Sequence, residues 1–221
     1  MDTVVDRLVR YAKVYSESDY YGQSGTPSAQ REFDMANLLV EELHGLGIDI
    51  VGDLPIYVAT DSADIWAEPQ FFQLDDERRP QFVAGVPPDR FNDDGQLWGN
   101  ALYDWDALQA DGYGWWIRRT AGALKLYDVI RIDHFRGFES YWSVPAGAKT
   151  ARNGEWRKGP GLDLVGVLKG WFPQARFIAE DLGYMTPAVM TLPADSGFPG
   201  MKPLQFPFGD GGQGFLTDLE P

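Results

Sequence analysis

The sequence predicts an α/β fold built around a parallel sheet. Segments with apolar residues at helical spacing alternate with short apolar runs of strand length, and three of these runs break into carboxylates at their C-terminal ends. Parallel α/β folds build their active sites at that end of the strands, and their crossovers are right-handed. An open doubly wound sheet remains possible on topology alone, although no GxGxxG motif follows the first strand.

The first half of the chain contains two helical segments, one strand and a long irregular stretch. Apolar residues recur at helical spacing over residues 3–13 and 31–43. The short apolar run at 48–51 predicts a buried strand. Residues 56–102 are rich in Pro, Gly and aromatics and are expected to be irregular, with one short helix after residues 61–62. Because long loops in compact domains are usually functional, we expect an inserted loop subdomain at about 56–103.

The second half repeats the alternation of helices and strands. Asp104 is typical of a helix N-cap. Gly- and Pro-bounded loops are expected over 133–161. Helices are predicted at 104–126, 162–172 and 187–192, and strands at 129–132, 176–179 and 201–206.

Composition excludes several classes of function. The 221 residues include no cysteine, which rules out disulfides and zinc–thiolate sites and suits a reducing cytoplasm. Lys and Arg total 19 against 33 Asp and Glu, so the net charge of 19 − 33 = −14 argues against nucleic acid or a membrane surface as partner. No signal peptide and no spanning apolar run is found, so we expect a soluble, cytoplasmic protein. The 8 Trp, 10 Tyr and 13 Phe suit sugar binding, although most should fill the core.

The three carboxylates at strand ends are the candidate chemistry. Asp53, Asp133 and Glu180 each follow an apolar run. Strand alternation places Arg131 on the same face as Asp133, where its charge favours an ionised, nucleophilic carboxylate. Glu180 follows three apolar residues, and burial there would raise its pKa and keep a proton available for a leaving group.

The spacing of these groups indicates a reaction class. If strands 129–132 and 176–179 are neighbours, their axes lie about 4.8 Å apart. Carboxyl groups at their tips would then be separated by roughly 5–5.5 Å, as in retaining glycosidases. The carboxylates lie on separate strand ends with no His or Cys cluster beside them, so we predict no metal site and no cofactor.

Five blocks of the sequence closely resemble the 4-α-glucanotransferases, also called amylomaltases or disproportionating enzymes, of glycoside hydrolase family 77. They occur in the family's order over about residues 31–209 and read GDLPIYVATDSADIWAEP, AGVPPDRFNDDGQLWGNALYDW, YDVIRIDHFRGFESYWSVPAG, IAEDLGYMTP and GFPGMKPLQFPF. The resemblance implies a TIM barrel of the α-amylase superfamily, of which this chain would hold about strands 3–6 with the inserted loop region. It also implies maltooligosaccharides and α-1,4-glucans as partners.

The resemblance assigns roles to the strand-end residues. Asp133 in RIDHFRGF would be the nucleophile, and Glu180 in AEDLG the general acid/base. Arg131 would be the partner of the nucleophile, and Asp53 in GDLP a support residue of the site. His134 follows the nucleophile, but alternation turns it to the other face, so a sugar contact and ordinary packing both remain open.

The segment 87–98 resembles the loop that covers the family's substrate cleft. The resemblance implies that Asp89, Phe91 and Trp98 meet glucose rings. Such a loop would exclude water while an acceptor sugar lies on aromatic faces, which favours transfer over hydrolysis. Asp181 should point away from Glu180 and serve the fold.

Three departures from the family are visible. The family uses a third carboxylate in a His-Asp-Asn segment, but neither His44 nor His134 is followed by Asp-Asn. The family's N-terminal part, with two barrel strands and an acceptor-binding Tyr, has no counterpart, and Arg90 stands where the family commonly has an aromatic. We therefore expect a fragment that is inactive or nearly so by itself.

Two other functions stay open. One is a related retaining α-glucan hydrolase, although GQLWGN and GDLPIYV favour the transferase. The other is a non-catalytic maltodextrin-binding module, in which the carboxylates only accept hydrogen bonds from hydroxyls. The products would separate the two enzymes, and a Glu180→Gln change would leave the binding module's affinity undiminished.

Overall fold

The computed structural model describes residues 2–14, 31–89, 92–182 and 186–201, apart from the side chains of residues 31 and 32. The chain divides into two compact units, Met1–Ile50 and Val51–Pro221. Each unit is described by itself below.

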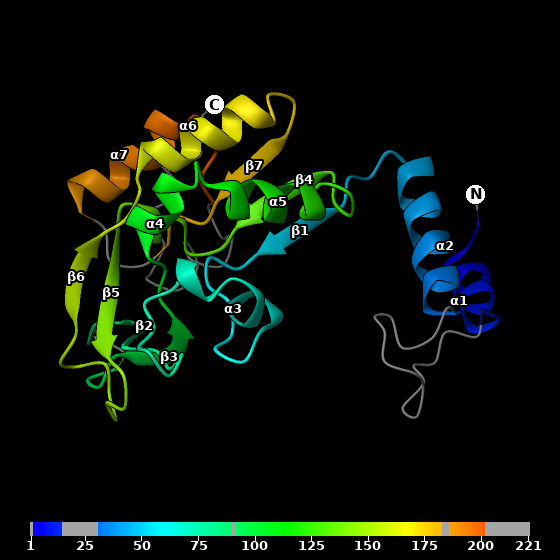
Figure 1. Ribbon diagram of the computed structural model, residues 1–221. Helices are drawn as coiled ribbons and strands as arrows, with labels where there is room; N and C mark the ends of the chain where they lie inside the picture. The colour runs from blue at the N-terminus through cyan, green and yellow to red at the C-terminus, as the bar shows by residue number, and fades with distance from the viewer. Residues whose placement is uncertain (1, 15–30, 90–91, 183–185, 202–221) are drawn as a thin grey trace, which may run out of the picture. The chain divides into compact units, whose positions relative to one another are not determined.

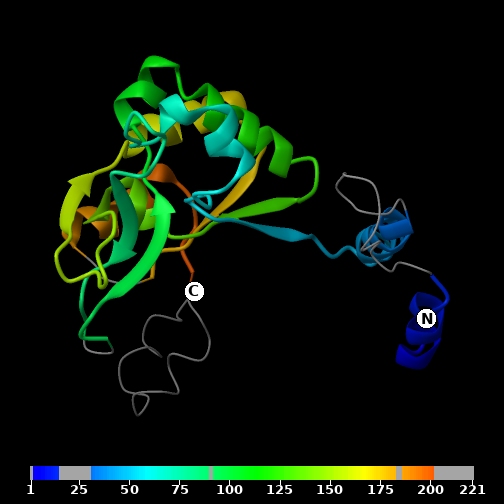
Figure 2. The same cartoon turned by 60° about the horizontal axis from the view of Figure 1, so that its bottom comes forward.

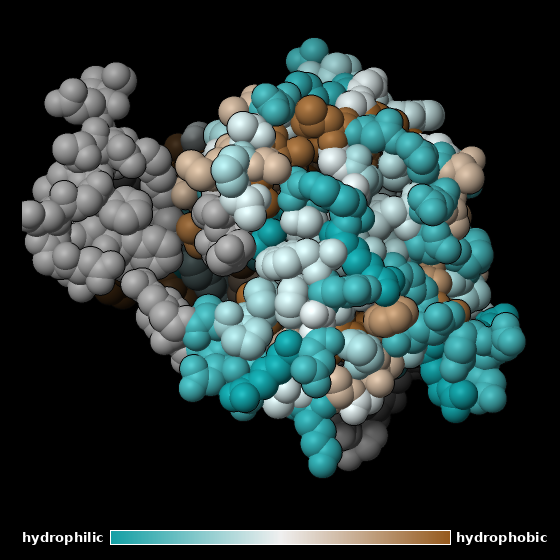
Figure 3. All heavy atoms as spheres, turned by 90° about the vertical axis from the view of Figure 1, so that its left-hand side faces the viewer, coloured by the Kyte–Doolittle hydropathy of each residue, from teal (hydrophilic) through white to brown (hydrophobic). Residues whose placement is uncertain are grey.

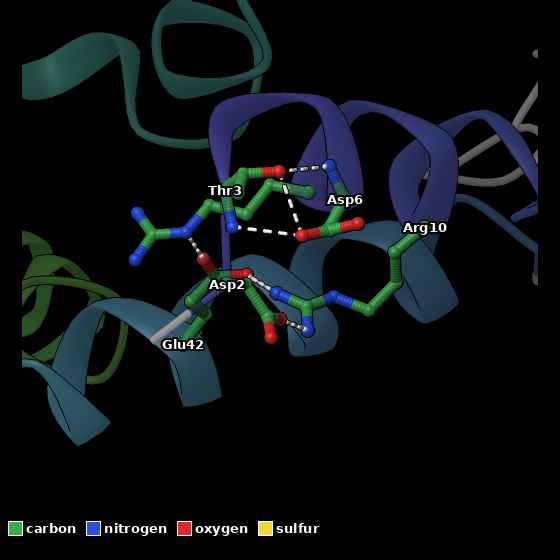
Figure 4. Close-up of polar contacts among 6 residues, drawn as sticks. Asp2, Thr3, Asp6, Arg10 and Glu42 are labelled. Atoms are coloured by element: carbon green, nitrogen blue, oxygen red, sulfur yellow. Dashed lines mark hydrogen bonds and ion pairs between the residues drawn. The ribbon is translucent and has the colours of Figure 1, made fainter.

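The first unit contains two helices, α1 (Val4–Ala12) and α2 (Arg31–Gly45), which confirms both predicted helical segments. At the start of α1, the Thr3 side chain accepts a hydrogen bond from the backbone amide of Asp6. The Asp6 carboxylate in turn accepts from the backbone amide of Thr3 at 2.9 Å. This reciprocal capping box satisfies two amides that an open helix end leaves unpaired (Figure 4).

Ion pairs join the two helices of this unit. Glu42 of α2 lies 3.0 Å from Nε of Arg7 and also pairs with Arg10. The Arg10 guanidinium reaches Asp2 as well, at 2.6 Å (Figure 4). Burial acts to raise the pKa of Glu42, but hydrogen bonds from Tyr11 and Arg10 and the charges of the two arginines outweigh it and hold the pKa below its ordinary value. Polar contacts therefore account for the association of these helices, since α1 buries no residue.

A parallel sheet in the second unit carries the predicted strand ends. Its strands are β1 (Val51–Leu54), β4 (Val129–Ile132) and β7 (Arg176–Ala179), in the order β1-β4-β7. The second and third have the predicted bounds. The first was predicted at 48–51 and this is wrong by three residues, because pairing begins only at Val51, opposite Val129.

Helices flank this sheet, and Figures 1 and 2 show α5 and α6 along one of its faces. The helices are α4 (Trp105–Ala110), α5 (Gly114–Ala123), α6 (Leu162–Trp171) and α7 (Pro187–Ser196). Asp104 caps α4 as predicted, accepting from the amide of Ala107 at 2.9 Å. The prediction of one helix over 104–126 is wrong, because Gly112 and Tyr113 both have positive φ, at 66° and 58°. Two successive left-handed residues end a right-handed helix.

A four-stranded antiparallel sheet fills segments that were expected to be loops. It comprises β2 (Phe82–Val86), β3 (Gln96–Ala101), β5 (Ser140–Pro145) and β6 (Glu155–Lys158), in the order β3-β2-β5-β6. The prediction of irregular structure over 56–102 and 133–161 is therefore wrong for these strands. The described part of the unit also contains the short helices α3 (Ala63–Ala67), η1 (Pro69–Phe71) and η2 (Phe135–Phe138), and α3 confirms the one predicted after residues 61–62.

An aromatic cluster forms the centre of the core. Trp116 is 0% exposed, and its ring centroid lies 5.7 Å from Tyr103 and 5.3 Å from Phe138. The surface differs: the face in Figure 3 is largely hydrophilic with scattered apolar side chains. The exposed tryptophans include Trp66 and Trp98, so only part of the aromatic content fills the core.

Candidate active site

The carboxyl ends of the parallel strands bring the predicted catalytic residues together. Ile132 of β4 pairs with Ala179 of β7, so Asp133 and Glu180 follow residues that face each other in the ladder. The backbone amide of Glu180 donates to the carbonyl of Ile132 at 3.0 Å and extends the pairing by one residue. The predicted adjacency of the two strands is confirmed. A retaining carboxyl separation stays a prediction.

Arg131 connects two of the three carboxylates. Its Nη1 lies 2.5 Å from Oδ1 of Asp53 and 3.1 Å from Oδ1 of Asp133. Burial lowers the pKa of Arg131, but the hydrogen bond and charge of Asp53 and the charges of Asp133 and Glu180 outweigh it and raise the pKa. The expected pairing of Arg131 with Asp133 is present, and Asp53 shares the same cation.

Glu180 has the environment of a proton donor. The residue is 7% exposed. Its Oε2 accepts from the backbone amide of His134 at 2.9 Å, and its Oε1 from that of Leu182 at 3.1 Å. Burial raises the pKa of Glu180 and the charge of Asp133 adds to the rise, while the two amide hydrogen bonds oppose it. A carboxyl with a raised pKa stays protonated closer to neutral pH, as a general acid requires.

His134 lies between the carboxylates and an aromatic surface. Its backbone is left-handed, with φ 52° and ψ 45°. The ring stands edge-on to Trp98 with centroids 4.8 Å apart, and Tyr57 lies 6.5 Å away. Burial lowers the pKa of His134 to about 4, and the charge of Arg136 contributes. The imidazole is therefore neutral at pH 7 and packs as an aromatic ring, while a sugar contact stays a prediction.

The predicted sugar-contact residues are placed as follows. Trp98 lies on β3 and is 39% exposed, so part of its surface is open to solvent. Asp89 is exposed in the loop that follows β2, and its Oδ1 accepts from the backbone amide of Asn92 at 2.9 Å. Phe91 and Arg90 lie outside the described residues. The roles of Trp98, Asp89 and Phe91 as sugar contacts stay predictions.

Residues 30–219 match the profile of the family described as 4-alpha-glucanotransferase, glycoside hydrolase family 77. The chain belongs to this family. It is similar to the 4-alpha-glucanotransferase of Streptococcus pneumoniae, with 56% identity over 161 residues that cover 73% of this chain and 32% of that protein. The Thermus thermophilus 4-alpha-glucanotransferase is 53% identical over 173 residues, covering 78% of this chain and 35% of that protein. The chain therefore spans about a third of the length of these curated relatives.

Solved structures of amylomaltases resemble the fold. The amylomaltase from Streptococcus agalactiae, in complex with acarbose, has a TM-score of 0.79 and 41% identity and covers 87% of this chain and 39% of its own. The amylomaltase from Corynebacterium glutamicum, at 21% identity, has a TM-score of 0.66 and covers 90% of this chain and 32% of its own. The second likeness concerns the fold alone.

Within this 4-alpha-glucanotransferase family member, the structure adds residues to the site that the sequence had not indicated. Met201 places its sulfur 3.0 Å from Nε of Arg131. Asp181 accepts the backbone amide of Met201 at 2.9 Å, which agrees with its expected structural role. Tyr57 is buried and also contacts Trp98, with centroids 6.4 Å apart. Its position in the GDLPIYV block was the available signal.

Two hollows in the described part of the chain are lined by other residues. One, of about 510 Å³, lies along β7 and the residues after α6, and is lined by Phe172, Phe177 and Phe198 among others. Another, of about 380 Å³, lies beside β6. Neither is lined by Asp133 or Glu180. The described residues contain no group of three or more His, Cys, Asp or Glu side chains that could hold a metal ion, and no helix among them is long and apolar enough to cross a membrane.

Proposed function

We propose that this chain carries the nucleophile and the acid/base of a 4-α-glucanotransferase that transfers α-1,4-glucan segments to an acceptor glucose or maltodextrin. The observation that carries the proposal is the pairing of β4 with β7, which sets Asp133 and Glu180 on neighbouring strand tips. One of the two carboxylates pairs with Arg131, and the other is buried with a raised pKa. Two carboxylates in such different environments suit opposite roles.

The first step of the proposed reaction forms a covalent intermediate. The Asp133 carboxylate attacks the anomeric carbon of the donor, and the bond from that carbon to the glycosidic oxygen breaks. Glu180 gives its proton to the departing oxygen, which leaves as the 4-hydroxyl of the released sugar. The amide hydrogen bonds from His134 and Leu182 hold the carboxyl of Glu180 in place for this transfer. The product of the step is a β-glycosyl ester on Asp133.

The second step reverses these roles. The ionised Glu180 removes the proton from the 4-hydroxyl of an acceptor sugar, whose oxygen attacks the anomeric carbon and releases Asp133. Two inversions give net retention of the α configuration. Arg131 faces Asp133 in both states and stabilises the carboxylate that leaves. Since Asp53 binds the same guanidinium, it is a support residue of the site.

Substrate binding is assigned to the antiparallel sheet and the loop after it. Trp98 offers a partly exposed ring for the C–H face of a glucose unit, with Asp89, Phe91 and His134 as further contacts. The wider architecture belongs to the proposal too: about strands 3–6 of a (β/α)₈ barrel, with an inserted subdomain at about 56–103. Maltooligosaccharides, rather than nucleic acid, are the proposed partners, in the cytoplasm.

A chimera tests the proposed chemistry. Residues 30–219 of this chain would replace the matching part of the Thermus thermophilus relative, which supplies the remaining two thirds of a protein of that length. The chimera should convert maltotriose into glucose and longer maltodextrins, and Asp133→Asn within it should abolish this conversion. The 221-residue chain by itself should show little or no conversion. Conversion that survives Asp133→Asn would refute the assigned nucleophile.

The same chimera separates the alternatives. A hydrolase would yield glucose and maltose without longer products. A non-catalytic binding module would bind maltoheptaose undiminished after Glu180→Gln and would form no covalent adduct. The transferase requires both longer products and an adduct.

A further inference from the structure

His134 contacts both sheets of the second unit at the site. It lies two residues after the end of β4, and its backbone amide donates to Oε2 of Glu180 at 2.9 Å. Its ring lies edge-on to Trp98 of β3, with an interplanar angle of 81°. One residue therefore touches the proposed acid/base through its backbone and the proposed sugar surface through its side chain.

The backbone conformation of His134 allows the first of these contacts. With φ 52° it is one of three non-glycine residues with positive φ in the described part of the chain. The next amide, of Phe135, donates to the main-chain oxygen of Glu180 at 3.1 Å. Successive N–H groups converge on one partner where the chain turns through a left-handed residue. The disfavoured conformation thus directs two amides at Glu180.

Close packing fixes the imidazole ring. A Cβ added at Gly137 would lie 3.1 Å from Cδ2 of His134 and 2.7 Å from Cδ1 of Ile56, so a larger residue there would make the ring and the end of the Ile56 side chain shift. Tyr57 lies on another side of the ring, tilted by 42°. Because burial and Arg136 lower the pKa of His134 to about 4, the ring carries no charge at neutral pH. The uncharged ring packs against the indole of Trp98 and needs no anionic partner.

We propose that His134 is a positioning residue, which fixes the carboxyl of Glu180 through its backbone amide and the indole of Trp98 through its ring. The inference rests on the proposed function, since it takes Glu180 as the acid/base and Trp98 as a sugar contact. It assigns His134 a role that needs no contact between the imidazole and the sugar. A displacement of His134 would then change the positions of both the Glu180 carboxyl and the Trp98 indole.

Two variants of the 221-residue chain separate the backbone contact from the ring contact. Asn tolerates left-handed backbone well, so His134→Asn should keep the amide contact and lose only the ring. Val is strongly disfavoured there, so His134→Val should lose both. The readouts are the titration of the Glu180 carboxyl by NMR, assigned with Glu180→Gln, and the affinity for maltoheptaose by calorimetry.

The amide of His134 lowers the pKa of Glu180, so its loss in His134→Val should raise that pKa further, whereas His134→Asn should leave it near that of the unsubstituted chain. Both variants should bind maltoheptaose about three- to tenfold more weakly, the effect of one lost aromatic contact. An unchanged pKa in a folded His134→Val chain, or unchanged affinity in His134→Asn, would overturn the proposal.

A third variant, Gly137→Ala, covers the case in which His134→Val does not fold. It should displace the ring and weaken maltoheptaose binding while residue 134 stays His, and unchanged affinity would again count against the proposal. If the unsubstituted chain binds no maltoheptaose, the affinities are compared in the chimera, and a chimera that neither binds nor converts maltodextrins would refute the proposed function. In that case, the NMR titration of Glu180 in the folded His134 variants still decides whether the amide of His134 holds the carboxyl.

Discussion

The two sheets of the second unit differ in what they present to the site. The parallel sheet ends in charged groups whose backbones continue the strand pairing, as the amide of Asp133 does by donating to the carbonyl of Leu54 at 3.0 Å. The antiparallel sheet instead presents Trp98, on a strand whose pairing with β2 shifts register between Val83 and Gly85. The regular pairing of the parallel sheet positions the proposed reacting groups. The antiparallel sheet, with its register shift, positions an aromatic ring, and a sugar needs only the broad apolar face of that ring. Substitutions in the first should therefore change turnover, and those in the second should change binding.

Glu180→Gln should have the largest effect on turnover. In the chimera, transfer from maltotriose should fall by at least about a thousandfold, because the departing oxygen loses its proton donor. α-Maltosyl fluoride needs no such proton, so this variant should still form the ester on Asp133 and then stall. Mass spectrometry of the intact protein would detect the adduct. An adduct on a residue other than Asp133 would contradict the claim that the parallel sheet carries the reacting groups.

Trp116→Ala should have the largest effect on stability. The ring is fully buried against Tyr103, which follows β3, and Phe138, which precedes β5, so its removal leaves a cavity beside the antiparallel sheet. The free energy of unfolding should fall by about 3–5 kcal/mol. Trp66→Ala is the matched control: Trp66 is 79% exposed, and its loss should change the unfolding free energy by about 0.5 kcal/mol at most. Chemical denaturation would show both values, and equal effects would refute the assigned core.

Trp98→Ala should weaken maltoheptaose binding about tenfold, as expected when one aromatic surface is lost. Trp156 lies on β6 of the same sheet with the same 39% exposure, and its ring packs against Trp142 rather than His134. Trp156→Ala should therefore leave the affinity within about twofold. Calorimetry would measure the affinity of both variants for maltoheptaose. An equal loss of affinity in both would contradict a specific role of Trp98 in sugar binding.

His134→Phe should leave the fold intact and change the pH dependence of stability. The pKa of His134 is about 4 in the folded chain against an ordinary value of 6.5. Between pH 6.5 and pH 4, His134 is therefore protonated in the unfolded chain and neutral in the folded chain. The stability contribution of the neutral ring is present above pH 6.5 and is lost as the pH falls toward 4. Denaturation midpoints should show this loss, on the order of 3 kcal/mol, in the unsubstituted chain but not in the variant.

The same contrast between sheets explains what the sequence could predict. The strands β4 and β7 were predicted with the correct bounds because VIRI and RFIA are short runs in which all residues but one Arg are apolar. The antiparallel strands show no such run: β3 reads QLWGNA and β6 reads EWRK, and both are partly exposed. Their pairing depends on partners distant in the chain, which local patterns do not encode.

The site shows a similar limit. Strand alternation was enough to place Arg131 beside Asp133, because both side chains belong to one continuous run. The contacts of Met201 and Tyr57 come from tertiary packing, which no local pattern encodes. The break at Tyr113 depends on packing as well, since its hydroxyl donates to Asp163 of α6 at 2.9 Å.

The central claim is that Asp133 and Glu180 lie close enough for the charge of the Asp133 carboxylate to raise the pKa of Glu180. NMR titration of the Glu180 carboxyl in the unsubstituted chain and in Asp133→Asn tests this claim most directly. Burial and the charge of Asp133 both raise the pKa of Glu180, so it should titrate above its ordinary value of 4.5 and should shift downward when Asp133 is replaced. A Glu180 that titrates at its ordinary value, or whose titration is unaffected by Asp133→Asn, would contradict the account.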